Sequence, residues 1–210
     1  MEKPIIILGS GGHAKVLIDA LVLNSAQVLG LTDVDQGKHG TEVKGITILG
    51  NDDIVLEYDK DAIFLVNGLG SVEDTSARAG LYRRFKSLGY SFASVIHPAA
   101  IIAADVQLAE GVQIMAGAVI QTGSRVGANA LINTRASVDH ECSVGEDVHI
   151  APGVTLSGAV HIGMATHIGT GATVINNVNI GSKVVVGAVS LVLQDIPDGH
   201  KVFGVPAKPK

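Results

Sequence analysis

An aliphatic residue recurs at every sixth position through the second half of this chain of 210 residues. The series runs without interruption from Ile96 to Val192, and only Ile, Leu and Val occupy its seventeen positions. Side chains repeat about every 3.6 residues on an α-helix and about every 2 on a strand, so a period of six fits neither. It fits a coil with three short flat faces, on which eighteen residues complete one turn. The repeat therefore predicts a parallel β-helix.

The repeat also predicts which way each side chain of the β-helix faces. The residue two places before each aliphatic is small or aliphatic, so it is expected to point inward, and Cys142 is predicted to be a core residue rather than a nucleophile. His140 falls at an outward position, and Gly158 lies eighteen residues further on, directly below it. His149 and His167 are also eighteen residues apart and should stack one coil apart on one face.

The first ~95 residues have a different pattern, in which short apolar runs alternate with helical spacing. The order strand, glycine turn, helix, strand predicts a small α/β domain of the Rossmann-like type. We expect a domain at 1–95, a β-helix at 96–194 and a capping tail at 195–210. Within the first domain, buried strands are predicted at 4–8, 27–32 and 62–66, a short edge segment at 46–49, and helices at 13–24 and 76–88.

Composition excludes several classes of protein. The net charge is −5 and no long Lys/Arg cluster occurs, which argues against a nucleic-acid-binding surface. The single cysteine excludes an internal disulfide and favours a reducing compartment. The longest N-terminal apolar run, Ile5 to Leu8, is too short for a signal peptide or a membrane helix. We expect a cytoplasmic protein with no membrane span.

A glycine-rich loop after the first predicted strand is the candidate nucleotide site. It has the G-x-G-x-x-A form of a dinucleotide fingerprint, and its alternative interpretation is a purely structural turn. Backbone amides at the start of a helix suit phosphates, and an acidic residue about twenty positions later suits a ribose. The candidate acceptor-binding residues are Gly9, Ser10, Gly11, Gly12, His13, Asp33, Asp35, Asn67 and Gly68.

The hexads and three local motifs together resemble a known family. The motifs are Gly9-Ser-Gly-Gly-His-Ala-Lys15, Val138-Asp-His-Glu-Cys142 and Gly204-Val-Pro-Ala-Lys208. They are similar to those of the bacterial hexapeptide-repeat acyltransferases with a left-handed β-helix. Within that group, the chain resembles the bacillosamine-pathway N-acetyltransferases that act on UDP-4-amino sugars, and the sialic acid O-acetyltransferases. The resemblance covers essentially the whole chain.

The resemblance implies a homotrimer that uses acetyl-CoA as donor and a sugar nucleotide as acceptor, with active sites between adjacent β-helices. It implies that His140 is the general base and that Glu141 orients it. It implies that His149 contacts the acyl group or the acceptor, that Asn133 is a polar residue nearby, and that the backbone amide of Gly158 is the oxyanion donor. His167 is a further candidate for binding the acyl group or CoA. For His167 and His161, spacing alone favours a solvated surface position instead.

The chemistry of the predicted reaction agrees with these residue types. An amine that attacks a thioester must first lose a proton, and histidine titrates near neutral pH. The carboxylate that supports the imidazole is Glu141, Asp139 or Glu146, because the adjacent residue is not automatically the partner. A metal site at His149 and His167 lacks a third ligand with suitable spacing, so no metal is expected.

Three other functions compete with the N-acetyltransferase. The acceptor group could be a hydroxyl, as in O-acetylation of sialic acid. The chain could instead be a non-catalytic trimeric scaffold that binds nucleotides, although the Asp139-His140-Glu141 segment argues against this. An NAD-dependent enzyme is disfavoured, because ~95 residues leave no room for both halves of a dinucleotide fold.

Overall fold

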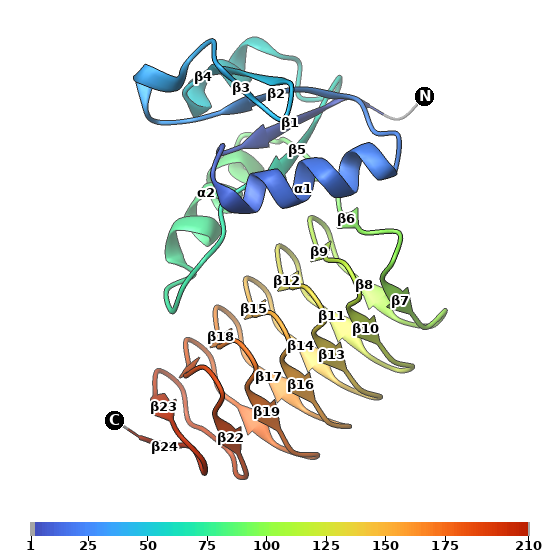
Figure 1. Cartoon of the computed structure of the whole chain (residues 1–210), viewed down its shortest axis with the longest axis vertical. Helices are drawn as coiled ribbons and strands as arrows, with labels where there is room; N and C mark the ends of the chain where they lie inside the picture. The colour runs from blue at the N-terminus through green and yellow to red at the C-terminus, as the bar shows by residue number, and fades with distance from the viewer. Residues whose placement is uncertain (1–2, 210) are drawn as a thin grey trace.

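The computed structural model describes residues 3–209, so the outer limits of the predicted domains, 1 and 210, lie outside the described residues. An α/β layer sits against one side of a long β-helix (Figure 1). The α/β part has helices on both faces of a sheet, and the β-helix runs away from it towards the C-terminus. The predicted α/β domain followed by a left-handed β-helix is confirmed.

The α/β part is built on a five-stranded sheet in the order β3-β4-β2-β1-β5. Only β3 runs antiparallel to its neighbour. The prediction of an edge strand at 46–49 is wrong, since β3 covers the outer side of β4. The strands are β1 (Ile5–Leu8), β2 (Val28–Thr32), β3 (Glu42–Val43), β4 (Ile46–Gly50) and β5 (Phe64–Asn67).

Helices cover both faces of this sheet. On one face, α1 packs beneath β1 and shares a hydrophobic cluster with Met115 and Leu131 of the β-helix (Figure 1). This helix therefore lies between the sheet and the β-helix. On the other face, Phe85 of α2 packs against Ile6 of β1. Both predicted helices are confirmed. The helices are α1 (Gly12–Leu23) and α2 (Ser76–Ser87), with short 3₁₀ segments η1 (Gln36–Lys38) and η2 (Asp52–Glu57).

The β-helix consists of seventeen two-residue strands between residues 95 and 192, and each ends on one aliphatic of the repeat. Strands three apart pair in parallel with a register of eighteen residues, as Val119 with Ser137. The result is three flat faces. The first face consists of β6 (Val95–Ile96), β9 (Gln113–Ile114), β12 (Leu131–Ile132), β15 (His149–Ile150), β18 (His167–Ile168) and β21 (Val185–Val186). The second face consists of β7 (Ile101–Ile102), β10 (Val119–Ile120), β13 (Ser137–Val138), β16 (Thr155–Leu156), β19 (Thr173–Val174) and β22 (Leu191–Val192). The third face consists of β8 (Gln107–Leu108), β11 (Arg125–Val126), β14 (Ser143–Val144), β17 (His161–Ile162) and β20 (Asn179–Ile180).

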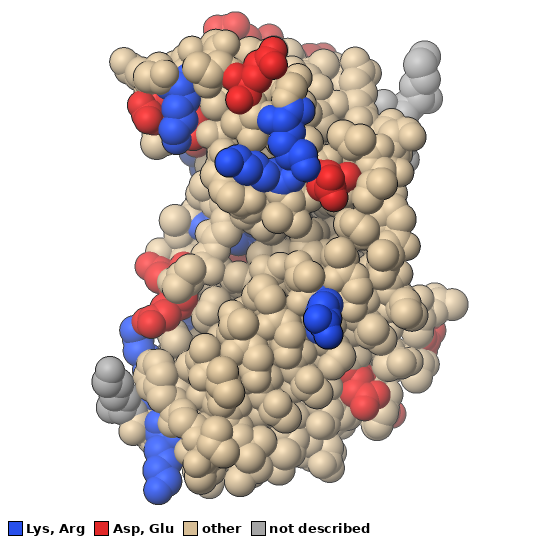
Figure 2. Space-filling view, in the orientation of Figure 1, with Lys and Arg blue, Asp and Glu red and all other residues tan. Residues whose placement is uncertain are grey.

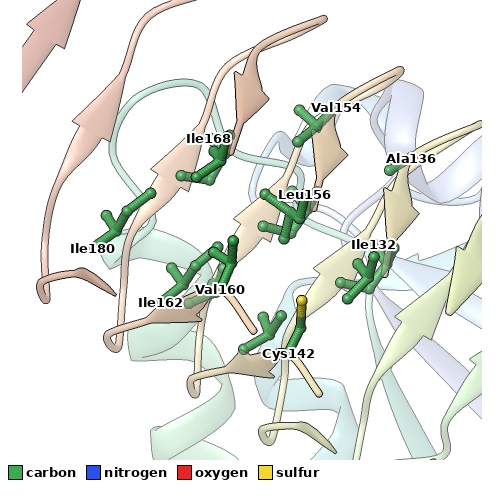
Figure 3. Close-up of a cluster of buried hydrophobic side chains, with 14 of the residues drawn as sticks. Ile132, Ala136, Cys142, Val154, Leu156, Val160, Ile162, Ile168 and Ile180 are labelled. Carbon is green, nitrogen blue, oxygen red and sulfur yellow. The ribbon is translucent and has the colours of Figure 1, made fainter. Parts of the chain in front are cut away.

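Small and aliphatic side chains fill the interior of the β-helix. Cys142 points into this core beside Val160, as predicted (Figure 3). Its burial raises the pKa of the thiol, which makes it less reactive. The tail leaves the repeat and extends the first face, because β23 (Lys201–Phe203) pairs with β21 and β24 (Lys208–Pro209) pairs with β23.

Candidate active site

His140 lies at the corner between the second and third faces of the β-helix, in the turn from β13 to β14. Its side chain is 54% exposed, in keeping with the outward position that the repeat predicts. Its Nδ1 lies 3.2 Å from Oε2 of Glu141, which adopts a positive φ of 59°. Of the three carboxylates left open by the sequence, the structure pairs Glu141 with this ring. A carboxylate on Nδ1 leaves Nε2 as the basic nitrogen.

Gly158 lies directly below the ring of His140. A Cβ at position 158 would come within 2.5 Å of His140 Cε1 and closer still to Nε2, so no larger residue fits under the ring in this position. Within residues 3–209, the amide of Gly158 donates no hydrogen bond. The predicted stacking of His140 above Gly158 is confirmed, and it places a residue with an unused backbone donor against the ring of His140.

His149 lies on the first face, in β15, and is almost fully buried. Asn133 Nδ2 approaches its Nε2 at 3.1 Å, and the orientation of this amide is fixed because Asn133 Oδ1 accepts from Thr134 N. Nε2 is therefore the acceptor, and Nδ1 carries the proton towards Ser71 Oγ, at 2.8 Å. Burial, followed by the charges of His167 and Arg78, lowers the pKa of His149 to about 3. The ring is neutral near pH 7.

His167 stacks one coil below His149, with ring centroids 4.9 Å apart, as the spacing predicts. The expectation that it is a solvated surface residue is wrong, because it is only 7% exposed. The segment that follows β5 covers this part of the first face and supplies Ser71 and Thr75 to it. Nδ1 of His167 is buried and has no partner within residues 3–209. His161 is exposed, as expected.

Two glycine loops meet at the carboxyl ends of β1 and β5. Gly68 N donates to Leu8 O at 2.8 Å, and a Cβ on Gly68 would lie 2.6 Å from that oxygen. Gly9 has a φ of 101°, which a residue with a side chain rarely adopts. A Cβ on Gly11 or Gly12 would meet nothing within 4 Å, so this side of the loop is open. In the sheet, β1 lies between β2 on one side and β5 on the other, so the connections that follow β1 and precede β5 diverge here. Sheets of α/β proteins bind ligands at such a topological switch point.

The acidic residues after β2 differ in what their side chains do. Asp33 accepts hydrogen bonds from Ser10 Oγ and from Lys38 Nζ, and so links the glycine loop to the end of the next strand. Burial would raise the pKa of Asp33, but these partners and the amide of Asp35 hold it below its ordinary value. Asp35 is exposed and its carboxylate caps η1. Ser10 and Asp33 thus lie together at the open loop.

His13 and Asn67 have roles that the sequence does not distinguish. His13 is half-buried at the start of α1, and its Nε2 lies 2.7 Å from Oε1 of Gln113. Burial and the charge of Arg78 lower the pKa of His13 to about 4. The prediction that Asn67 lines the nucleotide pocket is wrong, because its side chain is 1% exposed and bonds to Arg78 O and Asn129 Oδ1. Asn67 supports the loop from below.

The predicted site residues form two separate groups within one chain. His140, Glu141 and Gly158 lie at the corner between the second and third faces. His149 and Asn133 lie on or beside the first face, which is the side that the α/β part covers. In a three-sided coil, that corner is opposite the first face. A single chain therefore does not bring the two groups together.

Two family models match parts of this chain. Residues 4–85 match the family model of the PglD N-terminal domain, and residues 123–158 match that of the bacterial transferase hexapeptide with six repeats. No curated protein sequence matches the chain.

Several solved structures are similar over the full chain. The GDP-perosamine N-acetyltransferase of Caulobacter crescentus, whose complex with CoA and GDP-perosamine is known, is 36% identical, with a TM-score of 0.90 and coverage of 100% of this chain and 98% of that chain. The chain belongs to the family of hexapeptide-repeat sugar-nucleotide N-acetyltransferases. The acetyltransferase domain of PglB from Neisseria gonorrhoeae, in complex with acetyl coenzyme A, is 31% identical, with a TM-score of 0.91 and full coverage of both chains.

Membership of this N-acetyltransferase family confirms the predicted enzyme class, an acyltransferase. WeeI from Acinetobacter baumannii is 22% identical and has the same fold, with a TM-score of 0.88 and a match that covers 100% of each chain. Among residues 3–209, no three His, Cys, Asp or Glu side chains are grouped as a metal site requires. None of the helices in this part of the chain has the length and apolar content of a membrane span.

Proposed function

We propose that this protein transfers an acetyl group from acetyl-CoA to the amino group of a nucleotide-linked 4-amino-4,6-dideoxy sugar, with His140 as the general base. The observation that carries the proposal is the corner at His140, where the ring pairs with Glu141 and stands over Gly158. The relative at 36% identity is an N-acetyltransferase that binds CoA and GDP-perosamine. A UDP-sugar is the predicted acceptor.

In the proposed reaction, His140 carries the proton from the attacking amine to the departing thiolate. Its Nε2 accepts a proton from the amine as nitrogen attacks the thioester carbonyl and the C–N bond forms. The C–S bond then breaks, and His140 returns the proton to the departing sulfur. Glu141 at Nδ1 holds the tautomer and stabilises the transient imidazolium, as the carboxylate does in catalytic triads.

The amide of Gly158 is the proposed donor to the oxyanion of the tetrahedral intermediate. It lies beside His140 and donates no hydrogen bond within the described residues. A backbone donor that is fixed before the reaction stabilises developing charge without reorganisation. This role needs only the amide of residue 158, whereas the position of His140 also needs the absence of a side chain there.

A homotrimer accounts for the separation of the two groups. The α/β part of one chain would face the His140 corner of its neighbour, so that the base of one chain meets the acceptor held by another. The second face is suited to contact between chains because its outward strand residues carry no charge: Ile101, Val119, Ser137, Thr155, Thr173 and Leu191. In the view of Figure 2, charged side chains gather on the α/β part and at the margins of the β-helix, and the flank towards the viewer has few.

The roles of the segments follow from this arrangement. Residues 1–95 bind the sugar nucleotide at Gly9–Gly12 and Asp33, residues 96–194 bind acetyl-CoA and carry out the transfer, and residues 195–210 cap the coil. His149, Asn133 and His167 would face the acyl group and the acceptor from the neighbouring chain. The cytoplasm, where acetyl-CoA and sugar nucleotides are made, is the proposed location.

An acceptor panel tests this proposal. The protein is incubated with acetyl-CoA and with UDP-, GDP- and dTDP-linked 4-amino sugars or sialic acid, and products are weighed by mass spectrometry. Addition of one acetyl group to an amino-sugar nucleotide supports the proposal, and the preferred nucleotide is read directly. Acetylation of sialic acid alone would establish the O-acetyltransferase instead. No binding of acetyl-CoA in calorimetry would favour the scaffold.

The trimer has its own test. Light scattering on the purified protein should give three times the chain mass of 21.5 kDa. A monomer mass under conditions in which the enzyme is active would refute an active site shared between chains.

A further inference from the structure

Arg78 of α2 is a fully buried cation at the contact between the α/β part and the β-helix. Its guanidinium donates to Leu69 O at 2.7 Å and Asn67 O at 3.1 Å on the loop after β5. It also donates to Asn129 O, at 3.2 Å from Nη2, on a corner of the β-helix. All of these acceptors are backbone carbonyls. One side chain thus joins the loop at 67–71 to the β-helix.

None of the hydrogen bonds of Arg78 goes to a carboxylate, and the charge of Asp147 favours the guanidinium only from a greater distance. A buried charge without a direct ion pair is costly, and an apolar side chain would stabilise a domain contact at lower cost. The rigid fork of arginine can hold three carbonyls at fixed distances, which lysine or methionine cannot do. The retained charge therefore indicates a requirement for precise geometry in this loop.

The loop that Arg78 holds carries two further contacts towards the site. Gln113 Nε2 donates to Asn67 O at 2.7 Å, which turns Gln113 Oε1 towards His13 Nε2. His13 must then donate from Nε2, and its Nδ1 is left as an acceptor. At the other end of the loop, the hydroxyl and the carbonyl of Ser71 both lie near Nδ1 of His149, at 2.8 and 3.1 Å.

We propose that Arg78 is a positioning residue that fixes the loop at 67–71 against the β-helix and thereby sets the orientation and tautomer of His13 and His149. This inference rests on the proposed function, because it assigns both histidines to the acceptor side of the site. Arg78 itself contacts no substrate. Its burial lowers the pKa of the guanidinium only to about 9, so it stays charged near pH 7.

The charge of Arg78 adds to the geometric effect. It lies close enough to His13 and His149 to oppose the protonation of both rings, in addition to their burial. Gln113 faces the ring of His13, and His167, Ser71 and Asn133 face the ring of His149. A charge on His13 would also oppose the protonation of His149. None of these groups is a carboxylate that would favour the imidazolium. Both histidines are therefore available as neutral hydrogen-bonding groups.

Two substitutions separate the fork from the charge. In Arg78→Lys the charge remains and the fork is lost, so we expect KM for the sugar nucleotide to rise roughly tenfold. KM for acetyl-CoA should change less, because only His149 of the two histidines is placed at the acyl group. In Arg78→Met the charge is also lost, so the pKa values of His13 and His149, followed by NMR of labelled histidine, should rise. Arg84→Lys is the matched control, because Arg84 lies on the exposed side of α2 and pairs with Asp53.

The outcomes are distinguishable. If Arg78 only stabilises the fold, both substitutions lower the melting temperature but leave both KM values and the histidine titrations as in the wild type, and the inference is overturned. If the Arg78 variants do not fold, Gln113→Met tests the same loop, and an unchanged KM for the sugar nucleotide would refute the inference. A wild-type protein that acetylates no sugar nucleotide refutes the proposed function instead, and the histidine titrations still test the role of Arg78.

Discussion

Substitution of Gly158 by alanine tests whether the working enzyme uses His140 in the position that the structure gives it. The new methyl group would lie 2.5 Å from His140 Cε1, which is about 1 Å inside van der Waals contact. The backbone tolerates alanine, since Gly158 has no positive φ and Ala116, Ala128 and Ala188 occupy the equivalent position in other hexads. The exposed ring of His140 must therefore move.

We expect a large loss of activity with little loss of stability. Displacement of a catalytic group by about 1 Å costs on the order of 100-fold in rate. The amide at position 158 is retained, so the oxyanion donor is not removed. Because only a flexible, exposed ring is displaced, the free energy of unfolding should change by less than about 0.5 kcal/mol.

The assay is steady-state kinetics with acetyl-CoA and the acceptor found in the panel, together with thermal unfolding. Gly80→Ala is the control, because a Cβ there meets nothing within 4 Å and should leave kcat unchanged. A Gly158→Ala enzyme with wild-type kcat would show that His140 does not act from above Gly158. If the free energy of unfolding falls by much more than about 0.5 kcal/mol, the substitution disturbs the coil itself.

Two further predictions concern the ionisable groups. Glu141→Gln should lower kcat by less than His140→Ala, which removes the base and should cost about 10²–10⁴-fold in kcat/KM; equal losses would make the carboxylate itself essential. The lowered pKa values of His13 (about 4) and His149 (about 3), against about 6.5 in an unfolded chain, predict a pH-dependent stability. The unfolded chain binds protons first as pH falls, so the free energy of unfolding should be constant above about pH 7 and fall by about 1.4 kcal/mol per pH unit for each histidine between about pH 6 and 4. Denaturant unfolding at several pH values measures this slope, and its persistence in a His149→Gln variant at full size would contradict the assignment.

The sequence predicts the β-helix in detail because its geometry is set by a local count. Each aliphatic marks one face, so the outward position of His140 and the inward position of Cys142 follow from arithmetic alone. Prediction fails where a distant segment covers the coil. His167 is at an outward position of its hexad, and it is buried only because the loop after β5 lies over the first face.

The polar contacts between the two parts of the chain were not predictable for the same reason. Arg78 and Ser71 lie in no motif and outside the repeat, and the hexad count gives Gln113 only an outward position on the first face. Their roles depend on contacts between residues that are from 9 to 100 positions apart in the chain. Asn67 is predicted to face the ligand and is instead buried. Its place after a strand suggests a ligand contact, but its side chain turns inward and donates to Asn129 beneath the loop.

The central claim is that His140 of one chain acts on an acceptor held by the α/β part of another, and a complementation assay tests it most directly. A His140→Ala variant and a Gly9→Asp variant, each inactive alone, are unfolded together in equal amounts and refolded into mixed trimers. If active sites are shared between chains, about one quarter of the sites pair an intact His140 with an intact glycine loop, and about one quarter of wild-type activity returns. No recovery of activity from mixed trimers, shown to form by mass, would contradict the account.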